Sequence, residues 1–292
     1  MVPGPPLIAV PNASEGRDRA TIDAIAAAFE TRARLLDVHV DPDHGRSVYT
    51  IAAPQGDLHA ALLAGAREAV ARIDLTKHGG SHPHVGALDV APVVYLDDAQ
   101  RGPACAEALT AGALIGEELR LPVYLYGELA THPDHVQRAE LRRGGPEGLG
   151  GRIAGGQLTP DFGPHRMHPR AGALLVAARP PLIAFNVDLV TDDLERARHI
   201  AAGLRESGGG PPGVRAIGLY LPARGRAQVS LNVEDHRAVP LKEIVERVRE
   251  QAEIAEAELV GLAPKAAFEG FPGDVPLRGF DPGRHLIENA LR

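Results

Sequence analysis

The pentapeptide PPLIA stands at residues 5–9 of this chain and again at residues 180–184. The patterns that follow the two copies are alike, which indicates an internal duplication. The first copy precedes an apolar stripe at i, i+3, i+4 and i+7, typical of one face of a helix; its residues are Ile22, Ile25, Ala26 and Phe29. Two strand-like runs, a second helix with Asp57 as its expected cap and an apolar strand come next, at residues 33–40, 46–53, 58–73 and 90–96. The first module is therefore predicted to have the order βαββαβ.

The second copy repeats this order. A strand at residues 182–189 leads into a helix opened by Asp192, with Glu195 three residues on, the spacing of a capping box. Two strands then flank a short turn, a helix begins after Pro240, and a last strand closes the module; the strands are expected at residues 214–221, 227–233 and 257–263. Two βαββαβ modules predict an α+β protein of two ferredoxin-like domains, 1–179 and 180–292, each with helices packed on an antiparallel sheet.

The first module also carries additional segments. The sequence predicts an extra helix near residues 104–119 and an extra strand at residues 123–127. Residues 131–156 are dense in glycine, arginine and proline, so we expect a mostly irregular linker there. The same reasoning predicts that the chain from Phe268 onward lies as a tail over the surface.

The composition is that of an ordinary globular protein. Apolar residues make up 44% and charged residues 24% of the 292 residues, which argues against disorder. The formal charge of −7 opposes binding to nucleic acid or to an anionic membrane surface. No stretch approaches about 18 apolar residues, and the only cysteine, Cys105, allows no disulfide within one chain. We therefore expect a cytoplasmic protein that neither spans a membrane nor binds nucleic acid.

The densest cluster of reactive side chains is the run KHGGSHPHVGALDV at residues 77–90. Its glycines and proline disfavour a regular helix, which predicts a loop. Imidazoles in a loop can gain and lose protons near neutral pH. We favour His82 as the acid–base group, because Pro83 fixes the chain direction beside it and its small neighbours leave room for a substrate.

A metal site is the competing interpretation of this loop. Histidine is a frequent metal ligand, and Asp89 adds a carboxylate to His78, His82 and His84. The spacing fits neither one turn of a helix nor a strand pair, so we expect no metal. A further alternative is that His78 and His84 only hydrogen-bond the backbone of a tight loop.

A second polar cluster ends one predicted strand and opens the next, which places it at a hairpin end; it comprises Asp37, His39, Asp41, Asp43, His44 and Arg46. It could be a solvated turn. If the turn faces the histidine loop, a carboxylate there could orient and charge-stabilise an imidazolium. Asp37 and Asp41 are the candidates for that role.

A third segment, PDFGPHRMHPRAGA at residues 160–173, is basic in a chain that is acidic overall. Guanidinium groups pair bidentately with carboxylates, so this segment would suit a ligand that carries glutamate-like carboxylates. Aromatic residues make up only 4% of the chain, and Phe162 is the nearest candidate for stacking on a flat ring. A solvated loop is the alternative.

These segments together resemble the glutamate formiminotransferase family, which includes the transferase part of the bifunctional formiminotransferase-cyclodeaminases. The resemblance runs through nearly the whole chain, in the stretches VPNASEGRD, LLDVHVDPDHGRSVYT, ARIDLTKHGGSHPHVGALDV, LPVYLYGELA, PDFGPHRMHPRAGA, RPPLIAFNVDL, AQVSLNV and ELVGLAPKAA. It implies two ferredoxin-like subdomains, a homodimer, and transfer of a formimino group from N-formimino-L-glutamate to tetrahydrofolate, in histidine degradation and one-carbon metabolism.

The resemblance also implies particular site residues. The family's catalytic histidine falls on His82. Its folate-binding loop falls on Gly163, Pro164, His165, Arg166, Met167, His168, Pro169, Arg170, Ala171 and Gly172. As further groups that orient the catalytic histidine or bind substrate we take Asn12, Asp37, Asp41, Arg46 and Asp89.

The chain departs from the family pattern around this site. Ser81 and His84 replace an acid and an arginine of the family's histidine motif, and Gly145 replaces a glutamate. A carboxylate anchor would then have to come from an arginine such as Arg46, Arg142 or Arg166. Three alternatives follow: a folate-dependent transferase with another donor, such as N-formylglutamate or another formimino amino acid, a metal-dependent formiminoglutamate hydrolase, or a non-catalytic folate-binding protein.

Overall fold

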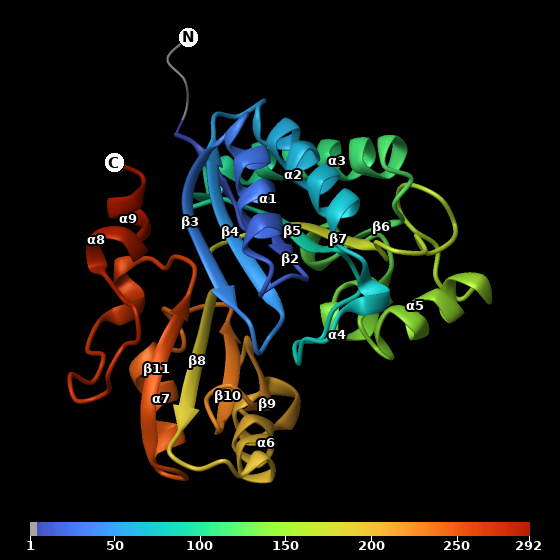
Figure 1. The fold of residues 1–292 in the computed structure, drawn as a ribbon. Coiled ribbons are helices and arrows are strands. Elements are labelled where there is room, and N and C mark those ends of the chain that lie inside the picture. Colours follow the sequence, from blue (N-terminus) through green and yellow to red (C-terminus); the bar gives the residue numbers. More distant parts are fainter. Residues whose placement is uncertain (1–4) are drawn as a thin grey trace. The chain divides into compact units, whose positions relative to one another are not determined.

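A computed structural model describes residues 5–292. The chain divides into two compact units, the first ending at Pro180 and the second beginning at Pro181. Each unit has its own sheet and its own hydrophobic core, and Figure 1 shows the elements of both. The predicted class, α+β with two ferredoxin-like modules, is confirmed. Both modules keep the spatial strand order 4-1-3-2 of a ferredoxin-like sheet.

The first module is built as the sequence predicts. Its elements are β1 (Leu7–Ala9), β2 (Asn12–Ala13), α1 (Arg19–Glu30), β3 (Arg34–Asp41), β4 (Arg46–Ala53), α2 (Leu58–Arg72) and β5 (Leu88–Val94). β1 and β2 both lie between β4 and β5, and β3 pairs with the other side of β4. All of these neighbours are antiparallel. The first strand position of the module, formed by β1 and β2, is therefore flanked by β4 and β5.

Additional elements extend this sheet beyond β5. They are α3 (Arg101–Glu118), β6 (Val123–Leu125), α4 (Arg138–Leu141), α5 (Gly145–Ala154) and β7 (Leu174–Arg179). β7 runs parallel to both β5 and β6 and lies between them. The prediction of a purely antiparallel sheet is therefore wrong for the first unit, whose sheet is mixed.

Two further expectations for this region are corrected. Residues 131–156 are not mostly irregular, because α4 and α5 lie within them. Pro146 stands in the first turn of α5, where its missing N–H costs no hydrogen bond, and the glycines that follow are tolerated because Leu149 and Ile153 are buried. β7 was not predicted, since its run LLVAAR does not alternate; strands of parallel sheets are buried on both faces and lack the period-two pattern.

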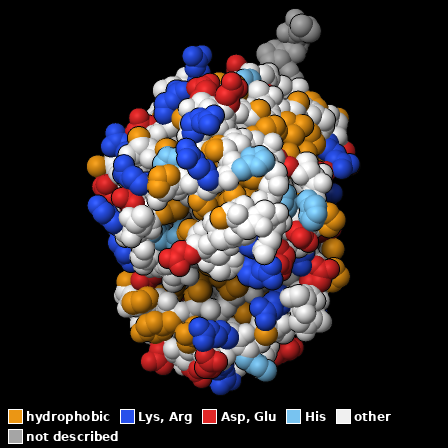
Figure 2. Space-filling model, turned by 90° about the vertical axis from the view of Figure 1, so that its right-hand side faces the viewer, with side chains coloured by type: hydrophobic (Ala, Val, Ile, Leu, Met, Phe, Trp, Pro, Cys, Tyr) orange, Lys and Arg blue, Asp and Glu red, His pale blue; other side chains and the backbone are white. Residues whose placement is uncertain are grey.

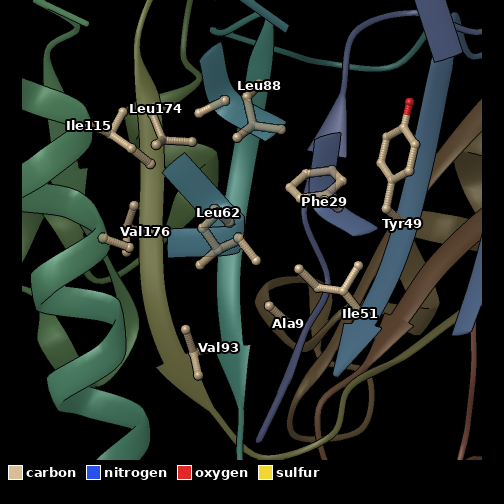
Figure 3. Packing of buried hydrophobic residues seen from close by; sticks show 14 of the residues in the cluster. Ala9, Phe29, Tyr49, Ile51, Leu62, Leu88, Val93, Ile115, Leu174 and Val176 are labelled. Carbon is tan, nitrogen blue, oxygen red and sulfur yellow. The ribbon is translucent and has the colours of Figure 1, made fainter. Parts of the chain in front are cut away.

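The core of the first unit lies between its sheet and α1, α2 and α3 (Figure 3). Phe29 of α1 packs on Tyr49 of β4, with 5.2 Å between ring centroids. Gly65 of α2 leaves room for the ring of Phe29, because a Cβ at this position would lie 2.1 Å from that ring. The predicted cap of α2 is wrong in one respect: the side chain of Asp57 makes no capping bond, and Glu107 of α3 accepts from the amides of Gly56 and His59 instead.

The second unit is an antiparallel four-stranded sheet in the order β11-β8-β10-β9. Its elements are β8 (Ile183–Leu189), α6 (Leu194–Leu204), β9 (Val214–Leu221), β10 (Arg226–Val233), α7 (Leu241–Arg249), β11 (Ile254–Val260), α8 (Pro282–His285) and α9 (Ile287–Ala290). The cap of α6 is Asp193, one residue later than predicted, and its carboxylate accepts from the amide of Arg196.

The C-terminal segment is more than a surface tail. Val275 and Ile287 are buried, and the rings of Phe268, Phe271 and Phe280 pack against the second core. Short 3₁₀ helices occur in both units at Leu75–Lys77, Asp98–Gln100, Gly127–Leu129, Pro133–His135, Glu206–Gly208 and Lys265–Phe268. The face drawn in Figure 2 intersperses acidic and basic side chains. Within residues 5–292, none of the helices is long and apolar enough to cross a membrane.

Candidate active site

The histidine loop, residues 78–87, lies against the hairpin that joins β3 to β4. The amide and the hydroxyl of Ser81 both donate to the carbonyl oxygen of Asp43, at 3.1 and 2.9 Å, and the amide of His82 donates to that of His44 at 3.4 Å. Gly80 is required for this contact, because a Cβ there would lie 2.1 Å from the carbonyl oxygen of His44. The condition set by the sequence, that the hairpin end faces the histidine loop, is met.

His82 is a half-buried imidazole with a defined tautomer. Its Nδ1 lies 2.8 Å from the carbonyl oxygen of Pro83, which can only accept, so Nδ1 carries the proton and Nε2 holds the lone pair of the neutral ring. Burial, and next the charges of Arg46 and Arg142, hold the pKa of His82 well below its usual value. Near neutral pH the ring is therefore an uncharged base.

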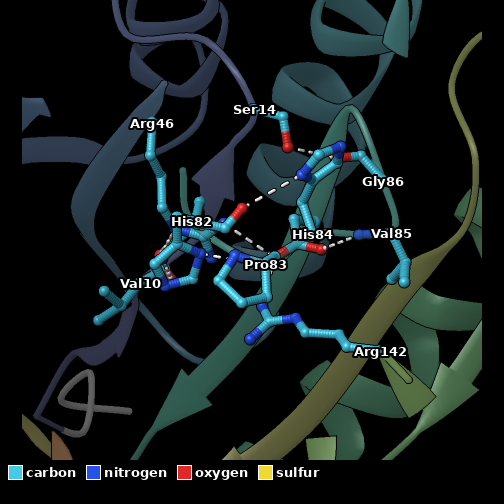
Figure 4. Close-up of polar contacts among 11 residues, drawn as sticks. Val10, Ser14, Arg46, His82, Pro83, His84, Val85, Gly86 and Arg142 are labelled. Atoms are coloured by element: carbon cyan, nitrogen blue, oxygen red, sulfur yellow. Dashed lines mark hydrogen bonds and ion pairs between the residues drawn. The ribbon is translucent and has the colours of Figure 1, made fainter. Parts of the chain in front are cut away.

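Asp89 of β5 is the anionic centre of the site, and Figure 4 labels its two arginine partners, Arg46 and Arg142, among the polar contacts near His82 and Pro83. It is fully buried, and its Oδ1 accepts from the amide of Val85 at 2.8 Å. Its Oδ2 accepts from Arg46 Nη1 at 2.9 Å and from Arg142 Nη2. Burial alone would raise the pKa of this carboxyl, but the two guanidinium groups and the Val85 amide outweigh burial and hold the pKa far below its usual range.

Arg46 connects this centre to the first strand. Its Nε donates to Asn12 Oδ1 at 2.9 Å, and the amide nitrogen of Asn12 donates to the carbonyl oxygen of Val10 at 2.8 Å. Burial lowers the pKa of Arg46 to about 10, although the charge of Asp89 acts in the opposite direction. A guanidinium that keeps so high a pKa stays charged at neutral pH. The β2, β4 and β5 strands thus fix one hydrogen-bonded unit beneath the histidine loop.

Of the five candidate orienting groups, the structure brings Asn12, Arg46 and Asp89 into one network. Asp41 forms the hairpin instead: its Oδ1 accepts from the amides of Asp43 and His44, both at 2.8 Å. Asp37 lies on β3 opposite Thr50 of β4. The charge of Asp89 raises the pKa of His82, but burial and the charges of Arg46 and Arg142 outweigh it. Orienting roles for Asp89, Asp37 and Asp41 stay predictions.

The other two histidines of the loop pair with each other. The rings of His78 and His84 meet edge to face, with 4.2 Å between centroids, and His84 Nδ1 lies 3.2 Å from the carbonyl oxygen of His82. Burial, and next the neighbouring His84, lower the pKa of His78. Among residues 5–292 there is no group of three or more His, Cys, Asp or Glu side chains placed to hold a metal ion.

The predicted folate loop, residues 163–172, is joined to the histidine loop by backbone hydrogen bonds. The amide of Ala87 donates to the carbonyl oxygen of Ala171 at 2.8 Å, and the amide of Ala173 donates to that of Val85 at 2.9 Å. Gly172 has a φ of 72°, and a Cβ there would lie 2.0 Å from the Val85 carbonyl oxygen. This glycine is what permits the two loops to touch.

The side chains of this loop divide into structural and exposed ones. His168 Nδ1 accepts from the amides of Arg170 and Ala171, which closes a tight turn, and Arg170 lies 3.4 Å from the carboxylate of Asp74. Ala171 and Gly172 are buried, Met167 packs against Gly150 of α5, and Gly163, His165, Arg166, Pro169 and Arg170 are exposed. Phe162, the predicted stacking partner, packs against Gly112 and Gly116 of α3.

Sequence reasoning placed Arg142 outside the core of the site, only as one possible carboxylate anchor. In the structure Arg142 follows the last residue of α4, and its guanidinium pairs with the carboxylate of Asp89. The available signal was local charge, because Arg138, Arg142 and Arg143 gather basic charge within a chain whose net charge is −7. Because the sequence did not predict α4, the positions of these arginines in the fold could not be inferred.

The comparisons with known proteins cover nearly the whole chain. Residues 7–179 match the family described as formiminotransferase domain, N-terminal subdomain, and residues 184–269 match the formiminotransferase domain. Glutamate formimidoyltransferases of Streptococcus pyogenes serotype M1 and Thermoplasma acidophilum are 35% and 37% identical; the alignments cover 97% of this chain and 97% and 96% of those proteins. The formimidoyltransferase-cyclodeaminase of Rattus norvegicus is 38% identical over 88% of this chain and 50% of its own. The chain therefore belongs to the formiminotransferase family of enzymes.

Proposed function

We propose that this enzyme transfers the formimino group of N-formimino-L-glutamate to N5 of tetrahydrofolate, giving 5-formiminotetrahydrofolate and L-glutamate. The observation that carries the proposal is His82, a neutral base near the charges of Asp89, Arg46 and Arg142, in a loop that backbone hydrogen bonds join to the predicted folate loop. The names of the full-length bacterial and archaeal relatives support the reaction.

The chemistry requires one group that both accepts and returns a proton. N5 of the folate attacks the amidine carbon, and the N5–C bond forms as N5 loses its proton to His82 Nε2. The imidazolium then gives that proton to the glutamate nitrogen as the C–N bond to glutamate breaks, so protons balance over one turnover. Acid–base help of this kind contributes about 10²–10⁴-fold in rate.

The surroundings of His82 suit both halves of this cycle. A lowered pKa keeps the ring neutral for the first proton transfer, and the buried carboxylate of Asp89 favours the transient imidazolium. The folate would lie along the exposed side chains of residues 163–172, whose Arg166 can pair with a glutamyl carboxylate. Holding the two substrates together contributes further by proximity. These assignments need no metal and no covalent intermediate.

The test is formation of 5-formiminotetrahydrofolate by the wild type and by His82→Ala. We expect the variant to lose about 10²–10⁴-fold in kcat while folding and folate binding persist. The matched control is His199→Ala, which removes an exposed histidine of α6 and should leave kcat unchanged. Full activity in His82→Ala would overturn the assignment of the base.

A change of donor is the nearest alternative, because Ser81, His84 and Gly145 depart from the family pattern. The argument for another donor is weaker at Ser81, because its hydroxyl donates a hydrogen bond to the carbonyl oxygen of Asp43. Turnover of N-formylglutamate or another formimino amino acid, with no turnover of formiminoglutamate at the same folate concentration, would favour the alternative. Release of glutamate without folate, abolished by a chelator, would favour a metal-dependent hydrolase, and tight folate binding without transfer would favour a binding protein.

The setting of the reaction is part of the same proposal. The product and the donor place the enzyme in histidine degradation and one-carbon metabolism. The family resemblance supports a homodimer, and light scattering of the purified chain should give about twice its mass of 30.8 kDa. The single cysteine supports a reducing, cytoplasmic location, which fractionation of cells that express the protein would test.

A further inference from the structure

The guanidinium group of Arg138 pairs with no carboxylate among residues 5–292. Arg138 is the first residue of α4, and within residues 5–292 it makes neither a side-chain hydrogen bond nor an ion pair. Its guanidinium carbon lies 5.5 Å above the ring centroid of Tyr126, a residue that is 5% exposed. The aromatic face attracts this half-buried cation, while no carboxylate of residues 5–292 pairs with it.

Arg138 lies on the same face of α4 as Arg142. The amide of Arg142 donates to the carbonyl oxygen of Arg138 at 2.9 Å, so the two side chains stand one helical turn apart on the same face, about 6 Å along the axis. Like charges at this spacing repel each other. Arg142 is in turn paired with Asp89, and the charge of Arg138 reaches Arg46.

The position of α4 is itself fixed. Arg152 of α5 donates to the carbonyl oxygens of Glu140, Leu141 and Arg143, at 2.8, 2.8 and 3.0 Å. These three bonds satisfy the end of a helix of four residues that could not persist alone. α4 thus holds Arg138 one turn from Arg142, which together with Arg46 pairs with Asp89. These three guanidinium groups carry more positive charge than the carboxylate of Asp89 neutralises.

We propose that Arg138 binds a carboxylate of the formimino donor and so sets the preference for glutamate, an inference that rests on the proposed function. Both substrates carry glutamyl carboxylates, but only those of the donor are attached within a few bonds of the transferred carbon. The glutamate of folate lies beyond a benzoyl ring from N5. A guanidinium one turn from the arginine that pairs with Asp89 suits the nearer carboxylate.

The test compares steady-state kinetics of Arg138→Gln with the wild type, varying each substrate in turn. We expect the KM for formiminoglutamate to rise about 10- to 100-fold, the loss of one charged hydrogen-bonded pair, with kcat and the KM for tetrahydrofolate changed less than about threefold. Arg143→Gln is the matched control, since this neighbouring side chain is 70% exposed and pairs only loosely with Glu140 at 3.8 Å.

A second arm identifies the carboxylate. Donors in which either the α- or the γ-carboxylate is replaced by an amide should be poor substrates of the wild type, and one of the two should lose nothing further in Arg138→Gln. Arg138→Lys keeps the charge but not the planar fork and should fall between wild type and Arg138→Gln. A rise in the KM for tetrahydrofolate alone, or no rise in either KM, overturns the inference.

A separate readout distinguishes this inference from the reaction itself. L-Glutamate, the expected product, can be titrated into the wild type and Arg138→Gln by calorimetry without folate. Weaker binding in the variant supports the role of Arg138 even if transfer is not detected. Equal binding of glutamate by both proteins would contradict it even if transfer is fast.

Discussion

At the scale of residues, substitution of Asp89 is expected to change the free energy of unfolding more than any other substitution in the site. Asp89→Asn keeps the shape of the side chain but leaves Arg46 and Arg142 buried without a counter-charge. Breaking a buried pair in this way costs about 3–5 kcal/mol, to be measured as the free energy of unfolding in urea. Asp23→Asn breaks the exposed helical pair with Arg19 instead and should cost less than about 1 kcal/mol. A loss at Asp89 no larger than at Asp23 would show that the network adds nothing to stability.

The lowered pKa of His82 sets the pH dependence of the reaction. We expect kcat/KM to be flat above pH ~6.5 and to fall on an acid limb that lies below the ordinary histidine value of ~6.5. Arg142→Gln removes a charge that lowers this pKa, so the limb should move to higher pH. An acid limb at or above pH 7 in the wild type would contradict a neutral, desolvated imidazole.

The same shift affects stability with a definite sign. A histidine whose pKa is lower in the folded than in the unfolded chain binds fewer protons when folded, so its contribution is complete above pH ~6.5 and decreases as the pH falls below that value. The pKa of Asp89 is also lowered, and its contribution is lost only at pH below ~4, as the pH approaches its folded pKa.

At the scale of elements, the contact between the histidine loop and the folate loop depends on one glycine. Gly172→Ala should destabilise the protein and lower activity together, because the new methyl group would lie 2.0 Å from the Val85 carbonyl oxygen. Gly156→Ala is the matched control: its φ of 69° is equally unfavourable for alanine, but nothing lies within 4 Å. The control isolates the left-handed strain, about 1–2 kcal/mol.

Thermal unfolding and transfer activity of both variants check this prediction. Gly172→Ala should show the lower melting temperature of the two and the larger loss of activity. Equal effects in the two variants would mean that only backbone strain, and not the approach of the two loops, restricts position 172.

Sequence patterns predicted the elements whose faces differ in polarity. The stripe of Ile22, Ile25, Ala26 and Phe29 located α1, and the alternation in β10 located that strand, since each buries one face only. β7 was missed because it is buried on both faces, and α4 because a helix of four residues has no period to detect. Its stability comes from Arg152, a contact made at a distance in the sequence.

The same distinction applies to the candidate site. His82, Arg46 and Asp89 could be named from the sequence because each lies in a segment of unusual composition, and Asn12 because its segment resembles the family. Their arrangement could not, since it depends on the bulged pairing of β2 with β5 and on the mixed sheet. Arg142 was named only as a possible carboxylate anchor and Arg138 was not named, because the sequence did not predict α4, which positions both.

At the scale of the whole molecule, the second unit is a complete module. It has its own core and the full strand order β11-β8-β10-β9. We therefore expect residues 181–292, expressed alone, to unfold cooperatively and to give a dispersed amide spectrum, but to have no transfer activity because His82 is absent. A spectrum typical of an unfolded chain would show that the second core needs the first unit to form.

The position of β7 between β5 and β6 also has a consequence for biosynthesis. β6 pairs with β7 and with no other strand of the described chain, although β6 leaves the ribosome earlier. Nascent chains that end before Leu174 thus carry the apolar segment VYL without its partner and are exposed to chaperones and proteases. Because the predicted folate loop immediately precedes β7, the pairing that protects the nascent chain also completes the candidate active site.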